Sequence, residues 1–118
     1  MIPIYIRLQA ELRNDYALSL QAVNNPTEAI RVLREACTID PGRLQSWGNL
    51  AVALKSSGDL EGALEAGRAA TKLAPRHAFV RHNLALTLHA LQRSSEAIEE
   101  WQLAVEADPT LVRRLNYV

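Results

Sequence analysis

Three prolines at a constant interval divide this chain into repeating units. Pro41, Pro75 and Pro109 are each separated by 34 residues, and small and large apolar residues recur at the same offset between them. Repetition at such a period indicates a solenoid of stacked helical units, each of which buries its apolar face against a neighbour. The sequence therefore predicts an all-α fold, and 118 residues are enough for one domain of this kind.

Each unit carries the pattern of two amphipathic helices. In the middle unit, Trp47, Leu50, Ala51 and Leu54 stand at i, i+3, i+4 and i+7, which is the apolar stripe of a packed helix. The second helix of that unit contains Gly67, although glycine costs about 1 kcal/mol relative to alanine inside a helix. We interpret this glycine as a sign of close packing between helices.

The breaks between the paired helices predict specific turns and caps. Gly58 should end one helix in a left-handed conformation, and Asp59 should cap the next. The corresponding cap is Asn25 in the first unit, and Ser94 or Ser95 in the third. These breaks and the prolines place the units at residues 10–43, 44–77 and 78–109.

Two segments flank the units. In residues 1–9, apolar residues spaced by four favour a helical extension, although the alternating isoleucines would also suit an extended arm. Residues 110–118 form either a short capping helix or the beginning of a fourth unit. Their apolar side chains Val112, Leu115 and Val118 should cover the last helix of the third unit, because the end of a solenoid must be shielded from water.

Composition excludes several classes of partner and site. Thirteen basic and thirteen acidic residues cancel, so no overall charge attracts nucleic acid or an anionic membrane. Cys37 is the single cysteine, which excludes an internal disulfide and a cysteine-based zinc site. No stretch is long and apolar enough for a transmembrane helix or has the form of a signal peptide, so we expect a cytoplasmic location.

The recurring residues resemble the tetratricopeptide repeat family over residues 10–109. The middle unit, with WGNLAVAL followed by GDLEGALEAGRAATKLAP, carries the resemblance best. Arg13 and Arg81 depart from it, since the family usually has an aromatic residue where Trp47 stands. The matching columns are Tyr16/Leu50/Leu84, Ala17/Ala51/Ala85 and Leu20/Leu54/Leu88 in the first helices, and Ala29/Ala63/Ala97, Leu33/Gly67/Trp101 and Ala36/Ala70/Ala104 in the second.

The resemblance implies a right-handed superhelix whose first helices line a concave groove. Members of the family use this groove to bind an extended peptide or a helix of a partner protein. The groove residues that the resemblance implies here are Asn14, Asp15, Leu18, Gln45, Asn49, Val52, Lys55, Phe79, His82, Asn83, Leu86 and His89.

Two binding chemistries of the family can be compared with these positions. A carboxylate clamp, which holds an acidic C-terminal peptide with lysines, asparagines and an arginine, is matched only by Asn49; the other clamp positions hold Asn14, Leu18, Phe79 and Asn83. An asparagine ladder, whose amides bind the backbone of a peptide, is matched at Asn49 and Asn83, with Asp15 on the third rung. The asparagines could equally form local hydrogen bonds, and the strip Leu18, Val52 and Leu86 could equally be ordinary packing.

Nothing in the sequence assembles a catalytic or metal site. Cys37 has small apolar neighbours typical of a packed thiol. His82 and His89 are seven residues apart, or about 10 Å along a helix, which is too far to share one ion. We therefore expect no enzyme activity, no metal and no cofactor.

Three functions remain open at this stage. The first is an adaptor or scaffold that binds a protein partner in its groove. The second is self-assembly into homo-oligomers through the apolar ends, namely the segment containing Ile4 and Tyr5 and the segment Val112–Val118. The third is a regulatory segment of a larger protein.

Overall fold

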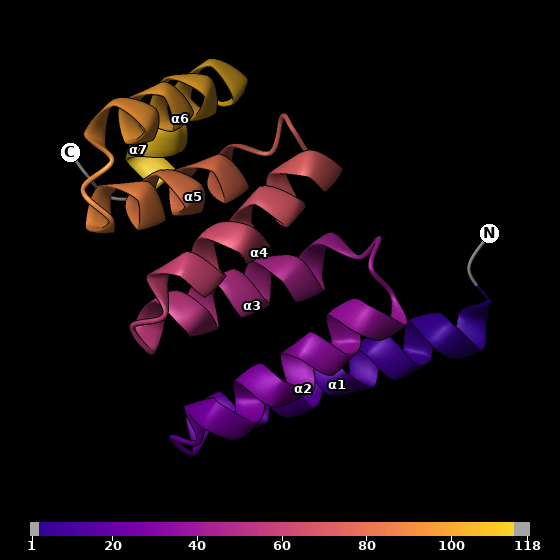
Figure 1. Cartoon of the computed structure of the whole chain (residues 1–118). Coiled ribbons are helices and arrows are strands. Elements are labelled where there is room, and N and C mark those ends of the chain that lie inside the picture. The colour runs from indigo at the N-terminus through magenta and orange to yellow at the C-terminus, as the bar shows by residue number, and fades with distance from the viewer. Residues whose placement is uncertain (1–2, 115–118) are drawn as a thin grey trace.

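The computed structural model describes residues 3–114, with seven helices and no strand in that range. Successive helices form antiparallel pairs, and the pairs stack one on the next from α1 and α2 to α5 and α6 (Figure 1). The predicted all-α solenoid is therefore confirmed. The helices are α1 (Ile4–Ala22), α2 (Pro26–Ile39), α3 (Leu44–Ser56), α4 (Leu60–Leu73), α5 (Ala78–Ala90), α6 (Ser94–Ala107) and α7 (Leu111–Arg114).

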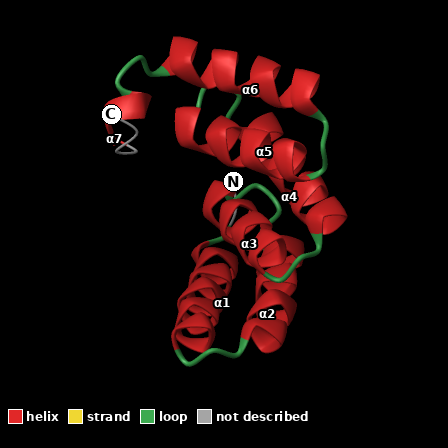
Figure 2. Ribbon diagram, turned by 90° about the vertical axis from the view of Figure 1, so that its left-hand side faces the viewer, coloured by secondary structure: helices red, strands yellow, loops and turns green. Residues whose placement is uncertain are grey.

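The turn inside each pair uses one backbone conformation three times. Asn24, Gly58 and Gln92 have positive φ angles of 61°, 91° and 63°, and they are spaced by the same interval as the three prolines. A left-handed residue at this point ends the first helix and reverses the chain direction. The period read from the sequence is thus also the period of the backbone. Figure 2 shows the molecule from the side, with the turn that joins α1 and α2 at the bottom.

The caps that follow these turns were predicted correctly in two units. Asn25 accepts a hydrogen bond from the Glu28 amide at 3.4 Å, and Asp59 accepts one from the Gly62 amide at 2.9 Å. In the third unit the prediction of Ser94 or Ser95 is wrong. Because Gln92 occupies the left-handed position, the cap position falls on Arg93, whose side chain binds Glu96 instead of the backbone.

The units pack through two junctions, α2 against α3 and α4 against α5. At the second junction, a Cβ atom added to Gly67 would lie 3.3 Å from Cδ1 of Leu84, closer than ordinary contact. The interpretation of Gly67 as a close-packing position is therefore confirmed. The first junction is filled differently, because Leu33 takes the position of Gly67 and is buried beside Leu50.

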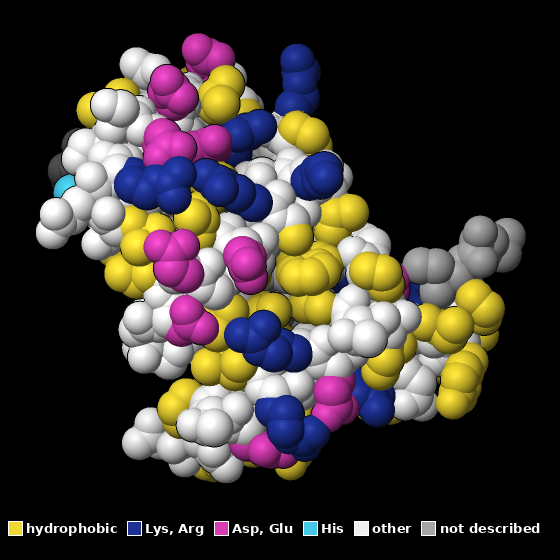
Figure 3. Space-filling view, in the orientation of Figure 1, with side chains coloured by type: hydrophobic (Ala, Val, Ile, Leu, Met, Phe, Trp, Pro, Cys, Tyr) yellow, Lys and Arg dark blue, Asp and Glu magenta, His cyan; other side chains and the backbone are white. Residues whose placement is uncertain are grey.

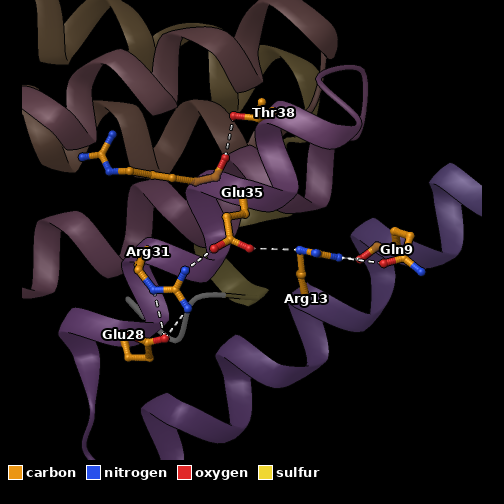
Figure 4. Close-up of polar contacts among 7 residues, drawn as sticks. Gln9, Arg13, Glu28, Arg31, Glu35 and Thr38 are labelled. Carbon is orange, nitrogen blue, oxygen red and sulfur yellow. Dashed lines mark hydrogen bonds and ion pairs between the residues drawn. The ribbon is translucent and has the colours of Figure 1, made fainter.

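Hydrogen bonds explain how arginine replaces the aromatic residue in two units. Nε1 of Trp47 donates to the carbonyl oxygen of Pro41 at 2.8 Å, and Nε of Arg81 donates to that of Pro75 at 2.7 Å. Both bonds span six residues, so Arg81 reproduces the bond that Trp47 makes. Arg13 instead reaches α2, where its Nε donates to Glu35 at 3.2 Å; Glu35 also binds Arg31, as Figure 4 shows.

The structure confirms the favoured prediction at the first end of the stack and differs from the prediction at the other. Residues 4–9 are part of α1, so the extension is helical and not an extended arm. At the other end, Leu111 of α7 is buried with Ala78 and Ala104. Leu111 thus covers the end of α6, a role that was assigned to Val112, Leu115 and Val118. Leu115 and Val118, like the side chain of Val112, lie outside what the structure describes.

Candidate functional site

A hollow of about 400 Å³ lies between α3 and α5, the first helices of the second and third units. Five of the predicted groove residues line it together: Gln45, Asn49, Val52, Phe79 and Asn83. The other lining residues are Gly48, which the resemblance also places in the groove, and three residues that were not expected there: Leu44, His77 and Val80.

The hollow combines apolar surface with amide groups. Val52 and Phe79 remain 40% and 44% exposed, so both present apolar atoms to a ligand. Nδ2 of Asn49 is buried and makes no hydrogen bond within the described residues, which leaves a donor of this amide unmet. No lysine, arginine, aspartate or glutamate is among the nine lining residues. The hollow is therefore suited to neutral, partly apolar ligands.

Two neighbouring residues hold parts of the wall in place. His77 stands at the N-cap of α5, where its Nδ1 accepts a hydrogen bond from the Val80 amide at 3.3 Å. Arg43 donates to Oε1 of Gln45 at 2.8 Å and also binds Glu11 of α1 at 3.2 Å. His77 was not predicted as a helix cap or a groove residue, although it stands at the predicted boundary between the second and third units.

Five further groove candidates do not line the hollow. Asp15 and Leu18 are exposed on α1, and His89 is exposed near the end of α5. Lys55 and Leu86 are half-buried. The structure thus divides the predicted set: the members that form the hollow all lie on α3, between Gln45 and Val52, or on α5, at Phe79 and Asn83.

Asn14 does not present its side chain to a ligand. It is only 1% exposed, and its Nδ2 donates a hydrogen bond to Oγ of Ser46 in α3 at 3.1 Å. Its position in the helix points it at the next unit, where it joins the two units. We therefore remove Asn14 from the candidate contact residues.

His82 is likewise committed to the interior. It is 4% exposed, and its Nδ1 accepts a hydrogen bond from Nε1 of Trp101 in α6 at 3.1 Å. Burial, and secondarily the charge of Lys55, lower the pKa of His82 below its usual range. We therefore assign His82 to the packing between α5 and α6. The ring of His89 also lies beside Trp101, with their centroids 6.0 Å apart.

Among residues 3–114, no group of three or more histidine, cysteine, aspartate or glutamate side chains is placed to hold a metal ion. None of the described helices combines the length and apolar character needed to cross a bilayer.

Comparison with known proteins decides the family. The model of the tetratricopeptide repeat family matches residues 14–78 and again residues 49–111, which together cover most of the chain. The chain belongs to the tetratricopeptide repeat family. The two overlapping matches follow the period of the units, and they include all the residues that line the hollow. The comparison with curated proteins gives no match.

Several solved tetratricopeptide repeat structures share the fold. A structure of MamA superimposes with a TM-score of 0.82 at 17% identity and covers 89% of this chain and 61% of that one. The first such domain of Spaghetti (RPAP3), bound to the HSP90 peptide SRMEEVD, gives 0.82 at 19% identity and covers 86% and 81%. The Sgt2 domain from Aspergillus fumigatus gives 0.79 at 23% identity and covers 85% and 66%.

At these sequence identities the likeness shows a shared fold and does not extend to the ligand. The chain also spans only part of the length of the MamA chains that it matches, covering 61% of one and between 57% and 72% of four others.

Proposed function

We propose that this tetratricopeptide repeat protein is a non-catalytic protein-interaction module that binds an extended peptide in the hollow between α3 and α5. The observation that carries the proposal is the composition of the hollow. Exposed Val52 and Phe79 offer apolar contact, and Asn49 and Asn83 offer amides on the two facing helices. An extended peptide can use both features, since its apolar side chains need apolar contact and its backbone groups need hydrogen-bond partners.

Asn49 supports a role in backbone recognition. Its unpaired Nδ2 is a donor that folding leaves unsatisfied, and a carbonyl oxygen of a peptide would satisfy it after a small rotation of the amide. Asn83 stands at the same position of the next unit and is half-buried in the same hollow. Two amides one unit apart can hold a peptide at two points along its backbone.

The ligand that fits is neutral and not an acidic tail. The RPAP3 domain named above carries the acidic peptide SRMEEVD, and the family's clamp for such a tail needs lysines and an arginine. Here Leu18, Phe79 and Asn83 stand at three of the clamp positions, and the fourth residue, Asn14, is buried. With no charged side chain at the hollow, a carboxylate would lose water without gaining an ion pair.

Selection from a random peptide library, followed by calorimetry, tests this proposal. Replacing both Asn49 and Asn83 with alanine should weaken a selected peptide by about 1–3 kcal/mol, because two backbone hydrogen bonds are lost. Val52→Asp should weaken it further by placing a charge on apolar surface. Gln102→Ala, which removes an exposed amide on α6, is the matched control and should leave the affinity unchanged.

Two results would contradict the proposal. Selected peptides whose affinity ignores both asparagine replacements would place their site elsewhere on the molecule. Tight binding of SRMEEVD itself would show that the hollow accepts an anion, contrary to its composition.

A further inference from the structure

The first helix carries a row of large apolar side chains that no described residue covers. Ile4, Leu8, Leu12 and Tyr16 follow one another at intervals of four, and Tyr5 adjoins them; all five are between 48% and 69% exposed. Residues four apart lie on one face of a helix, so these side chains form a continuous strip along α1. Figure 3 shows hydrophobic side chains gathered over the N-terminal part of this helix. A strip of this kind on a monomer indicates an interaction surface.

The strip occupies the face that joins units elsewhere in the molecule. Leu12 and Tyr16 take the positions that Ser46 and Leu50 hold in α3, and those two residues are buried against the preceding unit. Val80 and Leu84 hold the same positions in α5 and are buried as well. The face of α1 is therefore built for contact with a helix, and no unit within residues 3–114 supplies one.

The last unit of another copy does not fit this face. At the second junction, Leu84 fills the space that Gly67 leaves. A Cβ atom added to Gly67 would lie only 3.3 Å from Cδ1 of Leu84. In α6 the position of Gly67 is taken by Trp101, and in α1 the position of Leu84 is taken by Tyr16. Stacking α1 on α6 of the next molecule would force two large side chains into that space. In addition, α7 already lies against Ala104 of α6.

We propose that the strip binds the same strip of a second copy, with the two α1 helices antiparallel across a twofold axis. In this arrangement Leu8 of each copy faces Leu12 of the other, and Ile4 faces Tyr16. The row is self-complementary because its small and large members exchange places about its centre, as an isologous interface requires. This interface is independent of peptide binding in the hollow between α3 and α5.

Charge selects the antiparallel direction. Arg7 and Asp15 are exposed on the same side of the strip, on either side of its centre, and neither forms an ion pair with a residue in 3–114. Antiparallel pairing brings Arg7 of one copy within about two residues of Asp15 of the other, roughly 3 Å along the axis. Parallel pairing would place Arg7 of one copy and Asp15 of the other on opposite flanks of the interface, so neither attractive pair would form.

The mass of the protein measured by sedimentation equilibrium, from micromolar to millimolar concentration, tests the proposal. The wild-type mass should rise from 13.1 kDa to twice that value and stop there. Leu8→Gln with Leu12→Gln should raise the dimer Kd by about 100-fold or more, because four half-exposed leucines per dimer lose their apolar contact. The matched control is Ile98→Gln with Val105→Gln, which removes exposed apolar side chains from α6 and should leave the Kd unchanged.

Charge exchange tests the orientation. Arg7→Glu or Asp15→Lys alone should each raise the dimer Kd by about tenfold, because each change turns two attractive pairs into repulsive ones. The double variant Arg7→Glu with Asp15→Lys should restore the wild-type Kd. Far-ultraviolet circular dichroism should show the same helix content in every α1 variant, since the side chains of Arg7, Leu8, Leu12 and Asp15 are all exposed.

Four outcomes would overturn the proposal: a monomer at every concentration, a mass that keeps rising past the dimer, dissociation by the α6 variant, or failure of the double charge exchange to restore the Kd. Continued growth together with dissociation by the α6 variant would point to stacking of α1 on α6. None of these results depends on whether a peptide binds in the hollow.

Discussion

Asn14 and Ser46 join the first two units through one buried hydrogen bond, from Nδ2 of Asn14 to Oγ of Ser46 at 3.1 Å. The side chains are 1% and 0% exposed, so water cannot replace either partner. Oδ1 of Asn14 is also buried and has no partner in the described residues. A polar pair placed between apolar helices in this way fixes how one unit sits on the next, at some expense of stability.

Ser46→Ala should lower the free energy of unfolding by about 1–3 kcal/mol, because Nδ2 of Asn14 then stays buried without a partner. Adding Asn14→Leu to that variant should recover most of the loss, since both polar groups are then gone and the volume is kept. Urea-induced unfolding followed by circular dichroism measures both. If the double variant were less stable than the single one, the hydrogen bond would not be the source of the effect.

Arg81→Ala should destabilise the protein by about 1–3 kcal/mol, because Arg81 binds the Pro75 carbonyl at 2.7 Å and Glu100 at 2.6 Å in a half-buried position. Arg81→Trp should cost less, since an indole N–H can make the bond that Trp47 makes with Pro41. Thermal unfolding compares the two. Arg76→Ala, at an exposed neighbouring position, serves as the control and should change stability by less than about 0.5 kcal/mol.

Acid should weaken the contact between α5 and α6 through His82. Burial first, and Lys55 second, hold the pKa of His82 below the 6.5 of a free histidine, so the unfolded chain binds its proton more readily than the folded one. The stabilisation is therefore fully present above pH 6.5 and is lost as the pH falls toward the folded pKa. Stability measured against pH should show this loss, and His82→Phe should reduce its slope in that window. An unchanged slope would assign the pH dependence to other groups.

Cys37 should react with thiol reagents only when the first junction opens. Burial raises the pKa of its thiol to about 12, so the reactive thiolate is scarce at neutral pH, and the side chain is 4% exposed. The rate of reaction with an aromatic disulfide reagent should therefore rise with urea in step with unfolding of α2 and α3. Ser46→Ala should raise the rate in buffer, because loss of its hydrogen bond to Asn14 weakens the contact between the first two units. A fast reaction in buffer for the wild type would contradict the buried position.

The fold could be predicted from the sequence because the residues that recur with the period each favour a particular local structure. Gly58 permits a left-handed turn, Asp59 caps a helix, and Gly67 admits a neighbouring leucine. The third unit shows where this reasoning stops. Gln92 adopts the same positive φ without being a residue that favours it, because the helices on both sides determine the turn. Tertiary packing can thus override the local conformational preference of a residue at a repeated turn position.

The site was predicted less well for a related reason. Helical periodicity predicts on which side of a helix a residue lies. A residue at the edge of the groove-facing side, however, can face either the groove or a neighbouring helix. Asn14 and His82 share such a position, and both face a neighbouring helix. For Asn14, the sequence contained a clue to this orientation: its partner Ser46 is polar, whereas Leu12 and Val80 at the same position of the other units are apolar. Asn49 and Asn83, one residue further along each helix, do reach the hollow.

The contact between Gly67 and Leu84 determines where the chain could gain length through gene duplication. A second copy of residues 44–77 inserted after the first would set Gly67 against another Leu50, and a leucine at this position already fits beside Gly67 in the form of Leu84. A second copy of the third unit would instead set Trp101 against Leu84, which packs against a glycine in this structure. Duplication of the second unit is therefore compatible with this packing, whereas duplication of the third unit would also require replacement of its tryptophan.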